Sequence, residues 1–249
     1  MGDKVLEVRG LSKAFGGIQA VDRVSLSLAA GELQALIGPN GAGKTTLFHL
    51  LTGLLRPDAG TVWFRGMDIT ALAPERIWRQ GVSRTFQLPE VFPYLSLLEN
   101  VQVALLSAAR QAFVLWRDAT ALWHKQGEQL LAEVGLAHRM DDSAAALPYG
   151  DQKRLELAIA LANDPAVLLL DEPTAGLALQ ERRELMRLIQ TIAGRRRVAV
   201  LFTEHDMDVV FAMAQTILVL HQGRIIAAGM PQDIRANVEV QRVYLGRRG

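Results

Sequence analysis

A glycine-rich segment near the N-terminus has the residue types and spacing that bind a polyphosphate. It reads Gly38, Pro39, Asn40, Gly41, Ala42, Gly43, Lys44, Thr45 and Thr46. The pattern G-x-x-x-x-G-K-[ST] fits its first eight residues, which lie between an apolar strand pattern and a helical one. Glycines let backbone N–H groups point at phosphate oxygens, and the start of a helix adds partial positive charge. We assign all of these residues to a nucleotide site, with Lys44 on the β- and γ-phosphates and Thr45 as a ligand of Mg²⁺.

Two adjacent carboxylates, Asp171 and Glu172, follow the apolar run 167–170. In a parallel sheet such a run ends at the carboxyl edge, where ligands bind. Asp171 is predicted to hold Mg²⁺, directly or through water. Glu172 is predicted to be the general base that polarises the attacking water, a role worth roughly 10²–10⁴ in rate.

A histidine follows a second apolar run in the same way. Residues 198–202 are apolar, and Thr203, Glu204 and His205 come directly after them. An isolated histidine is more often a structural residue, but a second buried strand would carry this one to the same sheet edge. We therefore predict that His205 contacts the γ-phosphate and acts with Glu172 in catalysis.

Strand and helix patterns alternate at both ends of the chain. Apolar residues recur at strand spacing in 5–8, 24–28, 32–37, 61–65, 167–170, 198–202 and 216–220. Helical spacing occurs at 45–54 and again at 179–193. From 95 to about 162 the pattern is helical, with breaks expected near Gly127, Gly135 and 147–150. This order predicts an α/β fold with a mostly parallel sheet covered on both faces and a helical insertion.

The length of 249 residues suits one large domain. We expect 1–87 and 160–230 to form the α/β core with its β subdomain, 88–159 the helical subdomain and 231–249 a C-terminal tail. The apolar runs are all interrupted by charged or polar residues, so we expect none of them to span a bilayer. Residues 1–11 alternate charged and apolar side chains, which is typical of a strand and not of a secretory signal.

Charge and cysteine content argue against several classes of protein. The chain has 27 Lys and Arg against 26 Asp and Glu, a formal net charge of +1. Proteins that bind nucleic acid usually gather a basic surplus on one face, so we expect no nucleic-acid partner. The absence of cysteine excludes a disulfide framework and a thiolate metal site or nucleophile.

The order and spacing of these segments closely resemble an ATP-binding-cassette (ABC) ATPase over essentially the whole chain. The resemblance implies a P-loop NTPase (RecA-like) core with a mostly parallel sheet, an N-terminal antiparallel β subdomain and an inserted helical subdomain. It also implies ATP and Mg²⁺ as the bound nucleotide and metal. By the same resemblance, Phe15 corresponds to the aromatic residue that stacks on adenine. Gln87 corresponds to the glutamine that senses Mg²⁺ and the side of the transported substrate.

A turn before a helix occupies the place of the family signature Leu-Ser-Gly-Gly-Gln. It reads Leu147, Pro148, Tyr149, Gly150, Asp151 and Gln152. The resemblance implies that two subunits face each other head to tail and that this segment closes over the ATP held by the other subunit, adding a helix N-terminus to the γ-phosphate. Pro148, Tyr149 and Asp151 depart from the signature. Ala178 stands where the family commonly has Asp or Asn.

A finer resemblance is to ATPases of bacterial branched-chain (hydrophobic) amino-acid uptake systems. It is carried by 147–156, by 204–207, by the long stretch between 107 and 126, and by the ending 243–246. The resemblance implies two integral-membrane permease subunits, a second ABC ATPase subunit in a homodimer or heterodimer, and an extracytoplasmic solute-binding protein that acts indirectly. It implies a cytoplasmic protein held peripherally on the inner membrane. Urea and lipopolysaccharide transport ATPases are similar in parts.

Three classes of function stay open at this point. For an importer ATPase, the apolar segment 88–98 would receive a cytoplasmic helix of the permease. A soluble cassette ATPase acting on DNA or ribosomes usually has two cassettes, coiled-coil inserts or basic extensions, which this chain lacks. A small-molecule kinase would share the phosphate loop, but the pair Asp171 and Glu172 together with His205 disfavours it.

Overall fold

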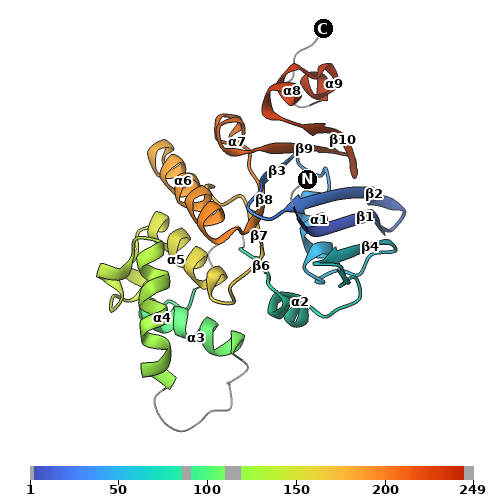
Figure 1. Cartoon of the computed structure of the whole chain (residues 1–249). Helices are drawn as coiled ribbons and strands as arrows, with labels where there is room; N and C mark the ends of the chain where they lie inside the picture. Colours follow the sequence, from blue (N-terminus) through green and yellow to red (C-terminus); the bar gives the residue numbers. More distant parts are fainter. Residues whose placement is uncertain (1–2, 86–90, 110–118, 244–249) are drawn as a thin grey trace.

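The computed structural model describes residues 3–85, 91–109 and 119–243. Within these residues it has a six-stranded sheet in the order β10-β9-β3-β8-β7-β6 (Figure 1). Its strands are β3 (Leu33–Ile37), β6 (Val82–Arg84), β7 (Val167–Asp171), β8 (Ala199–Thr203), β9 (Thr216–His221) and β10 (Arg224–Gly229). All neighbouring pairs are parallel except β9 and β10. The predicted α/β class with a mostly parallel sheet is confirmed.

A second sheet forms the N-terminal β subdomain, also as predicted. Its order is β2-β1-β4-β5, and every neighbouring pair is antiparallel. The strands are β1 (Lys4–Phe15), β2 (Ile18–Ala29), β4 (Ala59–Phe64) and β5 (Met67–Asp68). Near the start of β1, Leu6 and Val8 are buried, while Glu7 and Arg9 pair with each other on the outer face. This alternation is the period of a strand with one buried face.

The parallel sheet is covered on both faces because successive side chains of its strands point in opposite directions. Leu168 and Leu170 of β7 belong to a core cluster shared with helices on one face. Val167 and Leu169 belong to a second cluster, shared with the first helix and the β subdomain. The helices of the core are α1 (Lys44–Leu51), α2 (Pro74–Gln80), α6 (Leu179–Arg196) and α7 (Met207–Met213). The carboxyl edge of the sheet is thereby held between two layers.

The helical subdomain gathers at one end of the molecule (Figure 1). It contains α3 (Leu97–Ala108), α4 (Ala119–Glu133) and α5 (Tyr149–Leu161), with the short turns η1 (Ala137–Arg139) and η2 (Ala144–Ala146). Ser96 and Glu99 begin α3 with a reciprocal capping box. The break expected at Gly135 is present, since this residue follows α4 with a φ of +81°.

The break expected near Gly127 is wrong, because α4 continues through it. A Cβ at this position would lie 2.6 Å from Cδ1 of Leu98. The glycine therefore lets α4 approach α3 closely and does not end the helix.

Two short helices follow the last strand, and Figure 1 shows them at the opposite end from α3 and α4. They are α8 (Pro231–Ala236) and α9 (Val238–Val243). Ile234 and Val240 anchor them in the main core cluster, and the Arg235 guanidinium lies 4.5 Å from the centre of the Phe211 ring. Across the described part of the chain, no helix combines the length and apolar character needed to cross a membrane.

Candidate nucleotide-binding site

The glycine-rich segment connects β3 to α1, in the predicted order of strand, loop and helix. Two of its glycines have no room for a side chain. A Cβ on Gly38 would lie 2.2 Å from the carbonyl oxygen of Leu220, and a Cβ on Gly43 would lie 2.2 Å from that of Ala20. Gly43 also has a φ of +106°, a conformation that L side chains rarely adopt. Neighbouring backbone therefore sets the shape of the loop.

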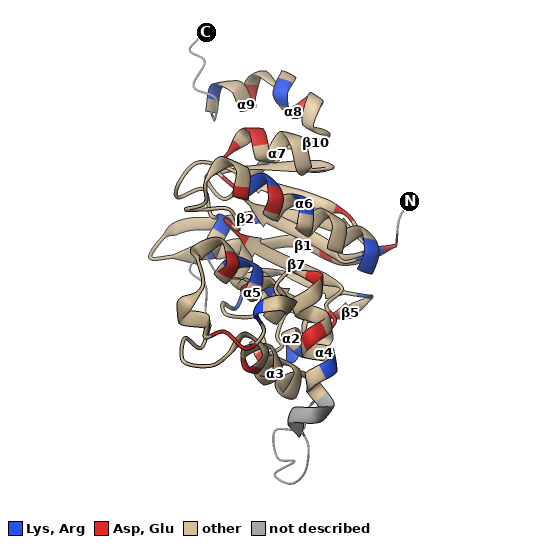
Figure 2. Ribbon diagram, turned by 90° about the vertical axis from the view of Figure 1, so that its left-hand side faces the viewer, with Lys and Arg blue, Asp and Glu red and all other residues tan. Residues whose placement is uncertain are grey.

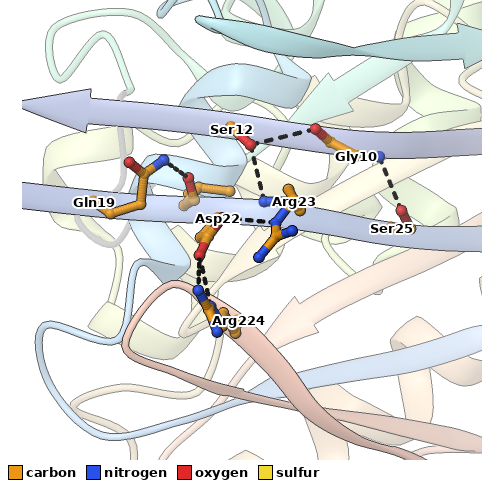
Figure 3. Close-up of polar contacts among 8 residues, drawn as sticks. Gly10, Ser12, Gln19, Asp22, Arg23, Ser25 and Arg224 are labelled. Atoms are coloured by element: carbon orange, nitrogen blue, oxygen red, sulfur yellow. Dashed lines mark hydrogen bonds and ion pairs between the residues drawn. The ribbon is translucent and has the colours of Figure 1, made fainter.

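The turn between β9 and β10 links the loop to β2. Gly223 donates its N–H to the carbonyl of Ala42 at 2.9 Å and accepts from the N–H of Asp22 at 2.8 Å. Next to this turn, Arg224 Nε donates to Asp22 Oδ2 at 2.6 Å (Figure 3). Strands from both sheets therefore meet at the loop and support it.

Lys44 begins α1, and its ammonium group contacts the loop. Nζ donates to the carbonyl oxygen of Gly38 at 2.7 Å and to that of Pro39 at 3.2 Å. Burial lowers the pKa of Lys44, and the negative charges of Glu172 and Asp171 oppose that shift. The first turn of α1 has no acidic residue and no side-chain cap, which suits an anionic group at this helix end.

The carboxyl ends of β7 and β8 bring the acidic pair and the histidine together. In the parallel register Asp171 lies beside Thr203. Glu172 Oε1 and His205 Nε2 are 2.7 Å apart. Glu172 has a φ of +49°, unusual for a residue other than glycine, and its N–H donates to Thr203 Oγ1 at 3.0 Å. The arrangement holds a carboxylate that can orient water beside an imidazole that can contact phosphate.

Asp171 has a partner that was not predicted from the sequence. Arg84 ends β6, and its Nη2 donates to Asp171 Oδ2 at 2.9 Å, while Thr203 Oγ1 donates to Asp171 Oδ1 at 2.8 Å. The Arg84 and Asp171 side chains are only 6% and 12% exposed. The order of β6 beside β7 puts an arginine at the end of one strand against an aspartate at the end of the next. The charge of Asp171 is therefore compensated inside the protein.

Replacing Arg84 by methionine is expected to lower the free energy of unfolding by about 3–5 kcal/mol, because it leaves the buried carboxylate of Asp171 without its counter-ion. Arg84→Lys keeps a positive charge and is the matched control, with a smaller loss. Urea unfolding followed by circular dichroism measures both. Equal stability of the two variants would contradict the proposed charge compensation.

Glu204 is a second residue that the sequence reasoning missed. It is 4% exposed, and its Oε1 accepts from the N–H of Thr174 at 2.8 Å and from its hydroxyl at 2.7 Å. Burial raises the pKa of Glu204, and the Thr174 hydrogen bonds oppose that shift. These bonds tie the loop after Glu172 to the residue before His205. Its place between Thr203 and His205, after an apolar strand, was the signal in the sequence.

The oxygen donors at this edge fit a magnesium ion. Mg²⁺ prefers oxygen ligands, and in nucleotide sites it is commonly held by one or two carboxylates together with substrate phosphates. Each oxygen of Asp171 accepts one hydrogen bond named above and has capacity for a further contact. Thr45 is exposed at the head of α1. Among the described residues there is no group of three or more His, Asp or Glu that would form an all-protein metal site.

The signature-like segment forms the start of α5. Leu147 is buried, and its carbonyl accepts a hydrogen bond from Gln152 Nε2 at 3.0 Å. Pro148 is the N-cap residue of α5. Arg139 Nη1 donates to Asp151 Oδ2 at 2.9 Å, so the negative charge that departs from the family pattern is paired.

Tyr149 packs on the loop that follows Glu172 in the same chain. A Cβ on Gly176 would lie 3.0 Å from Tyr149 Cε1. Lys153 Nζ lies 5.8 Å from the centre of the Tyr149 ring. The aromatic departure from the signature therefore occupies a defined contact within the subunit.

Three further residues were singled out from the sequence: Phe15, Ala178 and Gln87. Phe15 is 46% exposed and ends β1, in the hairpin of the β subdomain. Ala178 precedes α6 and donates its N–H to Glu181 Oε2 at 2.9 Å. Gln87 lies outside the described residues.

The fold and the site together define a P-loop nucleoside triphosphatase with an inserted helical subdomain. The family model described as ABC transporter matches residues 21–175. The branched-chain amino acid transport ATP-binding protein LivG of Salmonella typhimurium is 40% identical, and the match covers 99% of each chain. The corresponding protein BraF of Pseudomonas aeruginosa is 38% identical over 99% of each chain.

A solved structure gives the same result at the level of the fold. The crystal structure of an ATP-binding cassette of an ABC transporter in its ADP conformation has a TM-score of 0.87 and 28% sequence identity. The match covers 98% of this chain and 100% of that one. The chain therefore belongs to the ABC transporter family, as one of its ATP-hydrolysing cassettes.

Proposed function

We propose that this chain energises an ABC importer of branched-chain or other hydrophobic amino acids, bound peripherally to the cytoplasmic face of the inner membrane. The observation that carries the proposal is the 40% identity to LivG over 99% of both chains. Because the match covers 99% of the chain, it includes the helical subdomain and the C-terminal helices as well as the nucleotide site.

In the proposed mechanism, Lys44 and the N–H groups of the 38–46 loop bind the phosphates of ATP. Mg²⁺, held by Thr45, Gln87 and Asp171, would neutralise phosphate charge when bound. Glu172 orients the attacking water and takes up its proton, and the 2.7 Å contact with His205 holds its carboxylate in place. His205 then contacts the γ-phosphate through its ring.

The signature segment 147–152 is proposed to seal the ATP of a second cassette subunit. Its backbone N–H groups at the start of α5 would face the γ-phosphate across the dimer. The pairing of Asp151 with Arg139 supports this role, because it offsets a negative charge that would otherwise repel phosphate. ATP then closes the two subunits, and hydrolysis releases them.

The exposed part of the segment 88–98 is proposed to dock the permease. Phe92 is 53% exposed and Tyr94 is 94% exposed, although both are large and apolar. The backbone around them is held, since Asn100 exchanges two hydrogen bonds with Phe92, at 2.8 and 3.0 Å. Ser143 Oγ donates to the carbonyl of Pro93 at 2.8 Å. A firmly held loop with projecting aromatic rings suits a helix of a membrane partner.

The test is to assemble the chain in proteoliposomes with two permease subunits, a second cassette and a binding protein of a branched-chain amino-acid uptake system. Leucine-loaded binding protein is expected to stimulate ATP hydrolysis several-fold and to give ATP-dependent leucine uptake. The controls are the binding protein without a ligand and the binding protein incubated with urea in place of leucine. ATPase activity that persists but never responds to leucine, isoleucine or valine would reject the amino-acid assignment.

Lipopolysaccharide export is the second candidate function. The export ATP-binding protein LptB of Acidithiobacillus ferridurans is 36% identical over 98% of this chain and 97% of that protein. Stimulation of the ATPase by lipopolysaccharide and not by leucine would favour it. A nucleic-acid function has less support, because the formal net charge of the chain is only +1 and residues of both signs occur on its described helices (Figure 2).

A further inference from the structure

We propose that Asp58 and Lys13 are positioning residues that hold the Phe15 ring in the orientation that stacks on the base of the nucleotide. The inference rests on the proposed role of Phe15 and extends it to two residues in the turn and strand beside it. It assigns to the turn between α1 and β4 a part in base recognition.

The Phe15 ring stands at an exposed end of the β subdomain. Gly16 and Gly17 follow it, with φ values of +52° and +86°. A Cβ on either would meet nothing within 4 Å, so the turn is open. If the Phe15 ring is to hold one orientation at this open turn, contacts from outside the β1–β2 hairpin must support it.

Asp58 supplies that support through three hydrogen bonds to β1. Its Oδ1 accepts from Lys13 Nζ at 2.7 Å, and its Oδ2 accepts from the N–H of Ala14 at 2.7 Å. Its own N–H donates to the carbonyl of Ser12 at 2.9 Å. The three residues immediately before Phe15 are therefore fixed by one aspartate.

The turn that carries Asp58 is itself held against β1. A Cβ on Gly60 would lie 2.4 Å from the carbonyl oxygen of Gly10, so only glycine allows this close approach. The register of β1 and β4 shifts between Arg9 and Ser12, where the turn meets the strand. The anchoring point is thus rigid backbone.

Lys13 connects the carboxylate to the aromatic ring. Its Nζ lies 5.7 Å from the centre of the Phe15 ring, within the range of a cation–π contact. Lys13 thereby joins the Asp58 carboxylate to the ring that is proposed to stack on the base. The hydrogen bonds from Lys13 and Ala14 lower the pKa of Asp58, which favours its ionised carboxylate.

This arrangement predicts that the two residues affect the base and not the phosphates. Stacking of one base on an aromatic side chain changes affinity by about tenfold or more. Asp58→Ala and Phe15→Ala are therefore each expected to weaken ATP binding about tenfold and to leave the binding of inorganic tripolyphosphate unchanged. Combining the two changes is expected to give little further loss, because both remove the same contact.

The experiment measures dissociation constants of ATP and tripolyphosphate for the full-length chain with Mg²⁺ by isothermal titration calorimetry. The variants are Asp58→Ala, Lys13→Met, Phe15→Ala and the double variant Asp58→Ala with Phe15→Ala. Asp68→Ala is the matched control, because this aspartate lies in the same sheet and bonds Thr70. Asp58→Asn keeps one oxygen for the Ala14 N–H and is expected to lose about threefold in ATP affinity.

An equal loss of ATP and tripolyphosphate binding, or no loss of ATP binding in Asp58→Ala, would overturn the inference. Thermal unfolding of each variant shows whether it is folded. If Asp58→Ala does not fold, the ATP affinity of Asp58→Asn tests the inference in its place. A wild-type chain that binds neither ligand would instead refute the nucleotide site. The two failures are therefore distinguishable.

Discussion

Glu172→Gln is expected to lower kcat for ATP hydrolysis by about 10²–10⁴-fold, the usual contribution of a general base. Glutamine keeps the size of the side chain but cannot take up the proton of the attacking water. The carboxylate lies at the sheet edge and contacts His205 at 2.7 Å. Its removal is therefore expected to slow the reaction at the γ-phosphate. ATP affinity is expected to stay within about threefold of wild type, since a water-orienting group adds little to ground-state binding.

A coupled ATPase assay and a separate binding titration measure the two quantities. Glu184→Gln, on the exposed side of α6, is the matched control and is expected to hydrolyse ATP at the wild-type rate. An unchanged kcat for ATP hydrolysis in Glu172→Gln would contradict the assignment of Glu172 as the general base. A parallel loss of binding and rate would point to a structural role for this residue.

Lys44→Ala is expected to weaken ATP binding by about 100-fold. The ammonium group is buried, and the charges of Glu172 and Asp171 oppose the lowering of its pKa by burial. A charge-assisted hydrogen bond contributes about 1.5–3 kcal/mol, and Lys44 is assigned contacts with two phosphates. The variant also leaves the carbonyls of Gly38 and Pro39 without the lysine donor, so a small loss of thermal stability is expected.

Calorimetric titration with ATP and Mg²⁺ measures this loss, and Lys125→Ala, exposed on α4, is the control for removal of a positive charge. Binding as tight as wild type in Lys44→Ala would contradict the assignment of the phosphate site. Lys44→Arg is also expected to bind ATP more weakly than wild type, because the planar guanidinium does not replace a compact ammonium group in a closed loop.

Much of the fold could be predicted because local patterns dictate it. The apolar runs that became β3, β7, β8 and β9 are fully or nearly fully buried, so they are recognisable as central strands of a parallel sheet. The strand β10 was not predicted, although four of its six residues are apolar, because it lies at the edge of the sheet and most of its side chains are only partly buried. Gly127 was misjudged because its effect depends on Leu98 from another helix.

The candidate site divides in the same way. The sequence by itself determined the glycine loop, the acidic pair and the histidine, because each directly follows an apolar strand and the carboxyl ends of parallel strands share one edge. Only the tertiary structure decided which opposite charges pair at the site and around it: Arg84 with Asp171, Arg139 with Asp151 of the signature segment, and Lys13 with Asp58 beside Phe15. Of these pairs, Arg84 and Asp171 are 87 residues apart, and Lys13 and Asp58 are 45 apart. Such contacts depend on strand order and turn geometry, and no local pattern of residue types encodes them.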